Sequence, residues 1–293
     1  MSDTSEPKNV NLTAVAELFR GALNRHGHSF QARVLKDCRN LMLPFNFGTV
    51  NWQLRATDMA VTVQQREYHI DGVLEASGAN ANRFVTLECK RADPALKAWC
   101  FARFTEEPDS ICHDVWKKDA SGIRVEAEWL QSGGIGGRAT PIAHVGVEVN
   151  TGAKGDSTGK ALKEAIDQAH RGASGLANLI PTWIRSGTQT TIVPMIVTTA
   201  ALFVTRQPLE VASIETGDLE SVPVVETPCL WLLTPLSASL LPSSRPGINY
   251  RGEADPVGTI VRRHSERAAL IVNALHLQTA LAILSGTLTN PMQ

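Results

Sequence analysis

The sequence predicts a mixed α/β fold in which a central β-sheet is flanked by helices. Apolar residues recur at spacings of three and four over 11–24 and 159–180, which is typical of helices that bury one face. Apolar and polar residues alternate over 67–76, which is typical of a strand. Of the 293 residues, 43% are hydrophobic and 19% are charged, within the range of globular proteins. Helices and strands mixed along one chain predict the α/β class.

The first half of the chain is expected to begin with helices and to continue with strands. A helix over 11–24 is followed by a second helix that starts at Ser29 and ends at Pro44. A short β-rich run at 60–63 precedes two strands, over 67–76 and 83–90, which a turn cluster at 77–82 joins into a hairpin.

The second half of the chain is predicted to contain an insertion followed by strands and helices. Residues 92–140 are expected to form one or two short helices and a mobile loop around the glycines of 133–137. The elements expected next are a strand at 143–149, a helix at 159–180 before Pro181, one or two buried strands at 191–205, a strand at 230–234 and a helix at 261–285. We expect a core over 1–205, interrupted by the insertion, and a C-terminal strand and helix over 206–293 packed on the same domain.

Composition narrows the class of protein. The 28 Lys and Arg against 29 Asp and Glu give a net charge of -1, which excludes a uniformly basic nucleic-acid coat but allows a local basic groove. The five scattered cysteines suit a reducing compartment. Residues 1–10 lack the apolar segment of a signal peptide, and the apolar stretch at 191–205 is shorter than the ~20 residues of a membrane helix. We therefore expect a cytoplasmic protein with no membrane association.

The hairpin carries the most informative residues of the chain. Asp71 lies in one strand, and Glu88 and Lys90 follow in the next after sixteen intervening residues. Residues two apart on a strand share a face, so Glu88 and Lys90 project together, and Asp71 can lie across from them. Carboxylate oxygens are the ligands that Mg²⁺ prefers, and a bound Mg²⁺ acidifies water. The lysine would then orient that water and stabilise charge on a phosphate.

This pattern of Asp71 followed by Glu88-x-Lys90, on a hairpin after an N-terminal helix, resembles the PD-(D/E)xK nuclease superfamily. The resemblance covers about 11–205 and departs at Ile70, where the superfamily name has proline. It implies a restriction-endonuclease-like core with an insertion and a C-terminal extension. It also implies that Asp71, Glu88 and the backbone carbonyl of Cys89 bind Mg²⁺ or Mn²⁺, and that Lys90 is catalytic.

The same resemblance extends to residues outside the hairpin. Some branches of the superfamily carry a glutamine on the helix after the core strands, and Gln168 stands on that expected helix with Arg171 close behind it. Other members carry an acid on the first helix, where Glu17 is the candidate here. From the residues alone, Glu148 ends the next strand and is a further candidate acid near the metal.

The function that these features predict is metal-dependent hydrolysis of phosphodiester bonds in nucleic acid. A DNA endonuclease of bacterial restriction or antiphage defence is the first expectation. The alternatives are a DNA-repair nuclease and a catalytically inactive nuclease-like scaffold that binds a protein or ligand. The basic residues expected to bind nucleic acid are Arg91, Lys154, Lys160 and Arg171. A homodimer is expected because duplex cleavage needs two sites, and a partner protein is a further source of specificity, since no sequence-reading motif is present.

Overall fold

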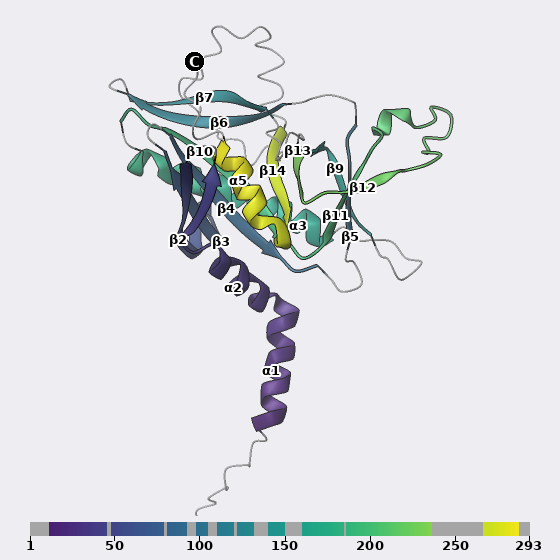
Figure 1. Ribbon diagram of the computed structural model, residues 1–293, viewed down its shortest axis with the longest axis horizontal. Helices are drawn as coiled ribbons and strands as arrows, with labels where there is room; N and C mark the ends of the chain where they lie inside the picture. The colour runs from purple at the N-terminus through teal and green to yellow at the C-terminus, as the bar shows by residue number, and fades with distance from the viewer. Residues whose placement is uncertain are drawn as a thin grey trace, which may run out of the picture.

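The computed structural model describes most of the chain, in ten segments (Figure 1). They are residues 12–45, 48–78, 81–92, 98–104, 110–119, 122–131, 140–149, 160–184, 186–235 and 266–286. The mixed α/β class expected from the sequence is confirmed, since a large curled sheet carries helices on both faces.

The large sheet contains ten described strands and combines parallel and antiparallel pairs. Its main order is β1-β2-β3-β4-β10-β14-β13-β8, and β6 joins β10 and pairs with β7. The bounds are β1 Leu41–Phe45, β2 Gly48–Val63, β3 Arg66–Ser77, β4 Ala81–Lys90, β6 Ser110–Asp119, β7 Gly122–Gln131, β8 Ile142–Ala143, β10 Gln189–Thr198, β13 Cys229–Pro235 and β14 Glu266–Asn273. Strands β3 and β4 form the expected antiparallel hairpin, and β4 runs parallel to β10, which runs parallel to β14.

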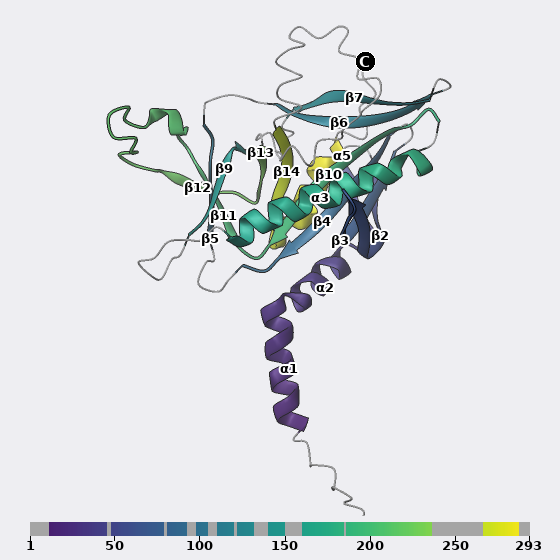
Figure 2. The same cartoon turned by 180° about the vertical axis from the view of Figure 1, so that it is seen from behind.

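Helices cover the two faces of this sheet. Helix α3 (Lys160–Trp183) crosses one face, whereas α2 (His28–Asp37) and α5 (Leu277–Gly286) lie on the other (Figures 1 and 2). Successive strand residues bury alternate faces, so Phe84 of β4 packs in the core under α3 while Val85 packs in the core under α2 and α5. A buried hydrogen bond from Trp52 Nε1 to Ser285 Oγ, 2.9 Å long, ties β2 to the end of α5.

A smaller four-stranded sheet lies beside the N-terminal end of α3, in the order β12-β11-β5-β9. Its strands are β5 Ala98–Ala102, β9 Val145–Val149, β11 Ala201–Thr205 and β12 Val224–Glu226. A 3₁₀ turn at Leu209–Val211 lies in the connection between β11 and β12. Strand β11 follows β10 after two residues, so the apolar stretch at 191–205 divides between the two sheets.

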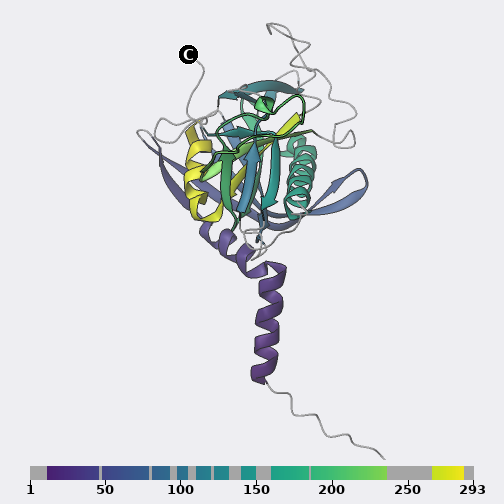
Figure 3. The same ribbon diagram turned by 90° about the vertical axis from the view of Figure 1, so that its right-hand side faces the viewer.

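Helix α1 (Leu12–His26) projects from the body of the molecule, and the chain bends at Gly27 into α2, which continues toward the large sheet (Figure 3). Gly27 has a φ of 76°, the left-handed conformation that glycine adopts readily. No helix in the described ranges has the length and apolar character needed to cross a membrane.

Several sequence-based expectations are wrong in their details. The second helix ends at Asp37 instead of reaching Pro44, which lies in the edge strand β1. The described residues of the 92–140 insertion form strands β5, β6 and β7 where short helices were expected, and its glycines at 133–137 lie outside the described residues. The expected helix at 261–285 is strand β14, a 3₁₀ turn at Ala274–His276 and then α5.

Candidate functional site

The candidate site begins where strands β3 and β4 separate. Their antiparallel ladder runs from Ser77 opposite Asn82 to Gly72 opposite Leu87, and Asp71 is the first residue of β3 beyond it. The backbone N–H of Cys89 donates a 2.6 Å hydrogen bond to Oδ2 of Asp71. The carboxylate of Asp71 therefore takes the place of a backbone carbonyl at the end of this ladder.

A side chain from α2 fixes the second oxygen of Asp71. The amide Nε2 of Gln31 donates a 2.8 Å hydrogen bond to Oδ1 of Asp71. Gln31 lies in the stripe of α2 that also contains the buried Val34, Leu35 and Cys38. Sequence analysis missed Gln31, although a polar residue within an apolar helix stripe is a signal for a buried polar contact.

Gly72 allows α2 to approach β3 closely enough for this contact. A Cβ atom at Gly72 would lie 2.6 Å from Cδ2 of Leu35, closer than side-chain carbons pack. Asp71 thus provides the carboxylate, and the missing side chain of Gly72 leaves room for Leu35 of α2 beside it.

Glu88 and Lys90 project from β4 on the face that α3 covers. Lys90 Nζ lies 3.0 Å from Glu88 Oε1, and their side chains are 24% and 8% exposed. The parallel strand β10 places Ile196 and Thr198 opposite them. Glu88 is therefore a nearly buried carboxylate, and Lys90 is the more accessible member of the pair.

Burial of these carboxylates changes their protonation. Desolvation is the largest effect on Glu88, and together with the negative charge of Asp71 it raises the pKa of Glu88 to about 7, against the opposing effect of Lys90. Desolvation also raises the pKa of Asp71, although the hydrogen bond from the Cys89 N–H opposes this. Desolvation is thus the main reason that the pKa of each carboxyl is above its ordinary value.

The donor set at this point consists of oxygen atoms. Asp71 and Glu88 supply two carboxylates, which suit a hard divalent cation. The C=O of a strand residue points to the same edge as its N–H, so the carbonyl of Cys89 is directed toward Asp71, beyond the end of the β3–β4 ladder. Within the described ranges, three or more His, Cys, Asp or Glu side chains are nowhere grouped as metal ligands, so a metal here would need this carbonyl and water.

The contacts of α3 place Gln168 relative to the strands. Gly175 lies against Val61 of β2, and one turn earlier Gly172 lies against Ile70 of β3. Gln168 lies one turn before Gly172 on this helix, and its side chain is exposed.

Arg171 is held by contacts within the protein. Its Nε donates to Asp167 Oδ2 at 2.7 Å, its Nη1 donates to the Tyr68 hydroxyl at 2.7 Å, and its guanidinium carbon lies 4.9 Å from the centre of the Tyr68 ring. These contacts anchor α3 to β3 and leave the side chain 19% exposed. Arg171 is thus a structural link next to the site.

Glu148 stands apart from the two carboxylates of the hairpin. It lies in β9 of the smaller sheet, is 2% exposed, and accepts a 2.7 Å hydrogen bond from the backbone N–H of Leu162. That N–H belongs to the first turn of α3, where unpaired donors favour a carboxylate. The structure therefore assigns Glu148 a role in fixing the start of α3.

The remaining predicted residues lie around the site or beyond the described residues. Arg91 Nη1 donates to the backbone carbonyl of Asn24, which connects the end of β4 to α1. Lys160, the first residue of α3, is exposed, and its Nζ lies 3.8 Å from Oε1 of Glu164. Glu17 is exposed on the projecting helix α1, and Lys154 lies outside the described residues.

No protein-family profile, curated protein or solved structure matches this chain. The function of this protein is therefore inferred from the geometry of the site itself.

Proposed function

We propose that this protein is a Mg²⁺-dependent nuclease that hydrolyses phosphodiester bonds. The observation that carries the proposal is that Asp71 lies close enough to Glu88 and Lys90 for their charges to interact, at the point where β3 and β4 separate. The resemblance of Asp71 and Glu88-x-Lys90 to the PD-(D/E)xK superfamily supports it, as does a mixed sheet with helices on both faces.

The residues present fit a divalent cation in chemical type. Asp71 and Glu88 would hold it through carboxylate oxygens, and the carbonyl of Cys89 would be a third ligand. When both are ionised, Asp71 and Glu88 carry two negative charges against the one positive charge of Lys90, and a cation would neutralise the excess. When bound, Mg²⁺ or Mn²⁺ supplies a more acidic water and positive charge beside a phosphate.

The protein's own side chains would do the positioning. Gln31 and the Cys89 N–H fix both oxygens of Asp71 and so orient its carboxylate. The Lys90 ammonium, 24% exposed beside Glu88, would orient the attacking water and stabilise the charge that develops on the phosphate. Gln168 on α3 would contact the water or the substrate.

DNA is the favoured substrate, and restriction or antiphage defence is the favoured setting, both by analogy with the superfamily. Lys160 and Arg91 are exposed basic residues on the elements around the site and would contact the phosphate backbone. A partner protein would add sequence specificity.

Direct assay of cleavage tests the proposal. Purified protein is incubated with plasmid, linear duplex, single-stranded DNA and RNA in Mg²⁺, Mn²⁺ or EDTA. We expect cleavage in Mg²⁺ or Mn²⁺ and none in EDTA. Asp71→Asn, Glu88→Gln and Lys90→Met should each lower the rate at least 1,000-fold, an estimate of about 4 kcal/mol in activation free energy, because the three residues act as one unit.

Matched substitutions of exposed residues control for nonspecific effects. Lys163→Met, on an exposed position of α3, and Glu226→Gln, in β12 of the smaller sheet, should cleave like the unmodified protein. If folded Glu88→Gln and Lys90→Met proteins cleave at the unmodified rate, the site assignment is wrong. If no nucleic acid is cut and Mg²⁺ does not bind, the inactive-scaffold alternative replaces the nuclease.

A further inference from the structure

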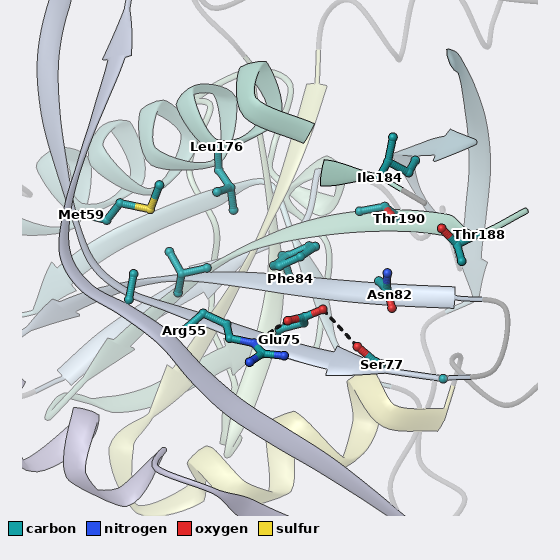
Figure 4. A pocket seen from close by; sticks show the side chains of 13 residues that line it. Arg55, Met59, Glu75, Ser77, Asn82, Phe84, Leu176, Ile184, Thr188 and Thr190 are labelled. Carbon is teal, nitrogen blue, oxygen red and sulfur yellow. Dashed lines mark hydrogen bonds and ion pairs between the residues drawn. The ribbon is translucent and has the colours of Figure 1, made fainter. Parts of the chain in front are cut away.

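A cavity of about 510 Å³ lies on the α3 face of the large sheet and excludes the candidate catalytic residues (Figure 4). It is lined by residues of β2, β3, β4, α3 and β10, by Gly78 after β3, and by Ile184 and Thr188 between α3 and β10. Phe84 lines the cavity and Glu88 follows four residues later on the same face of β4, so the cavity begins roughly 13 Å from the carboxylates. Its volume is that of a small-molecule site.

One side of the cavity is apolar and contains an aromatic ring. Phe84 stands over β4, Leu176 descends from α3, and Met59 and Ile184 close the two ends (Figure 4). Phe84 and Leu176 also belong to the core under α3, so these walls are held in place by packing. Such a wall suits one face of a flat ring.

The opposite side is polar and has no net charge. Arg55 Nε donates to Glu75 Oε2 at 2.5 Å, and Ser77 Oγ donates to Glu75 Oε1 at 3.0 Å. Arg55 is the extra residue of a bulge in β2, between Leu54 and Ala56, which redirects its side chain. The guanidinium and the carboxylate neutralise each other. No excess charge would therefore compensate the desolvation cost of a charged ligand bound beside them.

Asn82 supplies the remaining recognition group. Its side chain reaches the cavity from the first residues of β4. An amide presents a donor and an acceptor side by side, and this pattern matches the adjacent acceptor and donor on the edge of a purine ring.

We propose that this cavity binds a neutral, planar heterocycle of purine size, with one face against the apolar wall at Phe84 and its polar edge on Asn82. The site is independent of the nuclease proposal, because none of its lining residues belongs to the candidate metal site.

Calorimetric titration with adenine tests the proposal. We expect adenine to bind with a dissociation constant of roughly 0.1–1 mM, as its ten non-hydrogen atoms allow. N6,N6-dimethyladenine, which lacks the edge donors, should bind about fivefold more weakly, and adenosine monophosphate should bind more weakly still because its phosphate is charged.

Substitutions in the cavity locate the binding. Asn82→Ala should weaken adenine about fivefold, and Thr188→Trp, which fills the mouth, should abolish binding. Asn24→Ala on α1 and Thr216→Trp on the exposed connection before β12 are matched controls and should bind normally. Glu88→Gln should also bind adenine normally, which separates this result from the nuclease test.

The proposal is overturned if the unmodified protein does not bind adenine, or if it binds adenine and adenosine monophosphate equally. It is also overturned if both Asn82→Ala and Thr188→Trp bind like the unmodified protein. Asn82→Ala keeps the test decisive if Thr188→Trp does not fold.

Discussion

Glu88 combines burial with two charged neighbours of opposite sign. Its side chain is 8% exposed, Lys90 lies 3.0 Å away, and Asp71 adds negative charge nearby. Because its pKa is raised to about 7, the metal-free protein holds a proton on Glu88 over part of the neutral range. A metal ligand must be deprotonated, so binding of a cation has to displace that proton.

This proton predicts the pH dependence of metal affinity. Between pH 5.5 and 7, the affinity for Mg²⁺ should rise by up to about tenfold per pH unit, and above pH 8 it should level off. Calorimetry in buffers of different ionisation enthalpy would show release of one proton per metal near pH 6. An affinity that is constant from pH 5.5 to 8 would contradict the assignment of Glu88 as a ligand.

Gln31 acts on the site through Asp71. Replacement by Ala removes a donor to Oδ1 and leaves the carboxylate free to rotate. We expect Gln31→Ala to slow cleavage about tenfold, the equivalent of one lost hydrogen bond, and to raise the Mg²⁺ concentration needed for half-maximal rate. Gln207→Ala, at an exposed position, is the matched control. A lower rate with unchanged Mg²⁺ dependence would place Gln31 outside the metal site.

At the scale of elements, the register of α3 across the sheet decides the role of Gln168. If the helix places Gln168 over β4, Gln168→Ala should slow cleavage by about 10- to 100-fold through loss of positioning, with DNA affinity little changed. Lys163→Ala, five residues earlier and also exposed, should have no effect. Single-turnover rates and DNA-binding isotherms would measure the two quantities separately. Full activity of Gln168→Ala would remove it from the site.

The hairpin and the amphipathic helices could be predicted because their signals are local. Asp71, Glu88 and Lys90 lie on one hairpin, so strand periodicity alone brings them near one another. The contact of Gln31 with Asp71 spans 40 residues and depends on how α2 docks over Gly72, which no local pattern specifies.

Strand β14 shows why the sequence predicts some elements wrongly. Residues 268–272 form a continuous apolar run, which fits a buried strand as well as a buried helix. The strand lies between β10 and β13 with both faces covered, since Ile271 packs under α3 and Leu270 under α5. Pro44 after an apolar helical pattern predicts a helix end, but an edge strand such as β1 tolerates proline because one side of the strand needs no hydrogen-bond donors.

At the scale of the whole molecule, two buried groups shift the pH dependence of stability in opposite directions. His170, on α3, is 5% exposed and hydrogen-bonds through Nε2 to Thr234 Oγ1 of β13 at 3.0 Å. Desolvation, followed by the positive charge of Arg267, lowers the pKa of His170 to about 4. Glu88 has the reverse behaviour, because its pKa in the folded state is above the ordinary value of 4.5.

The direction in which each residue changes stability with pH depends on whether the folded or the unfolded state binds more protons there. Between pH 4 and 6.5 the unfolded state binds more protons at His170, so this residue makes stability rise with pH over that window. Between pH 4.5 and 7 the folded state binds more protons at Glu88, so this residue makes stability fall with pH. The two contributions to the free energy of unfolding therefore oppose each other between pH 4.5 and 6.5.

Single substitutions should separate these slopes. In EDTA, Glu88→Gln should lose stability steadily as the pH falls from 6.5 to 4.5, because only the His170 contribution remains. His170→Gln should instead lose stability as the pH rises from 4.5 to 7, with its overall stability lowered by the disturbed packing. Urea unfolding at half-unit pH steps measures both, and the double substitution should restore a shallow profile because the two residues are independent. If the free energy of unfolding changes with pH in the same way in the two single variants, the two groups do not titrate as their burial predicts.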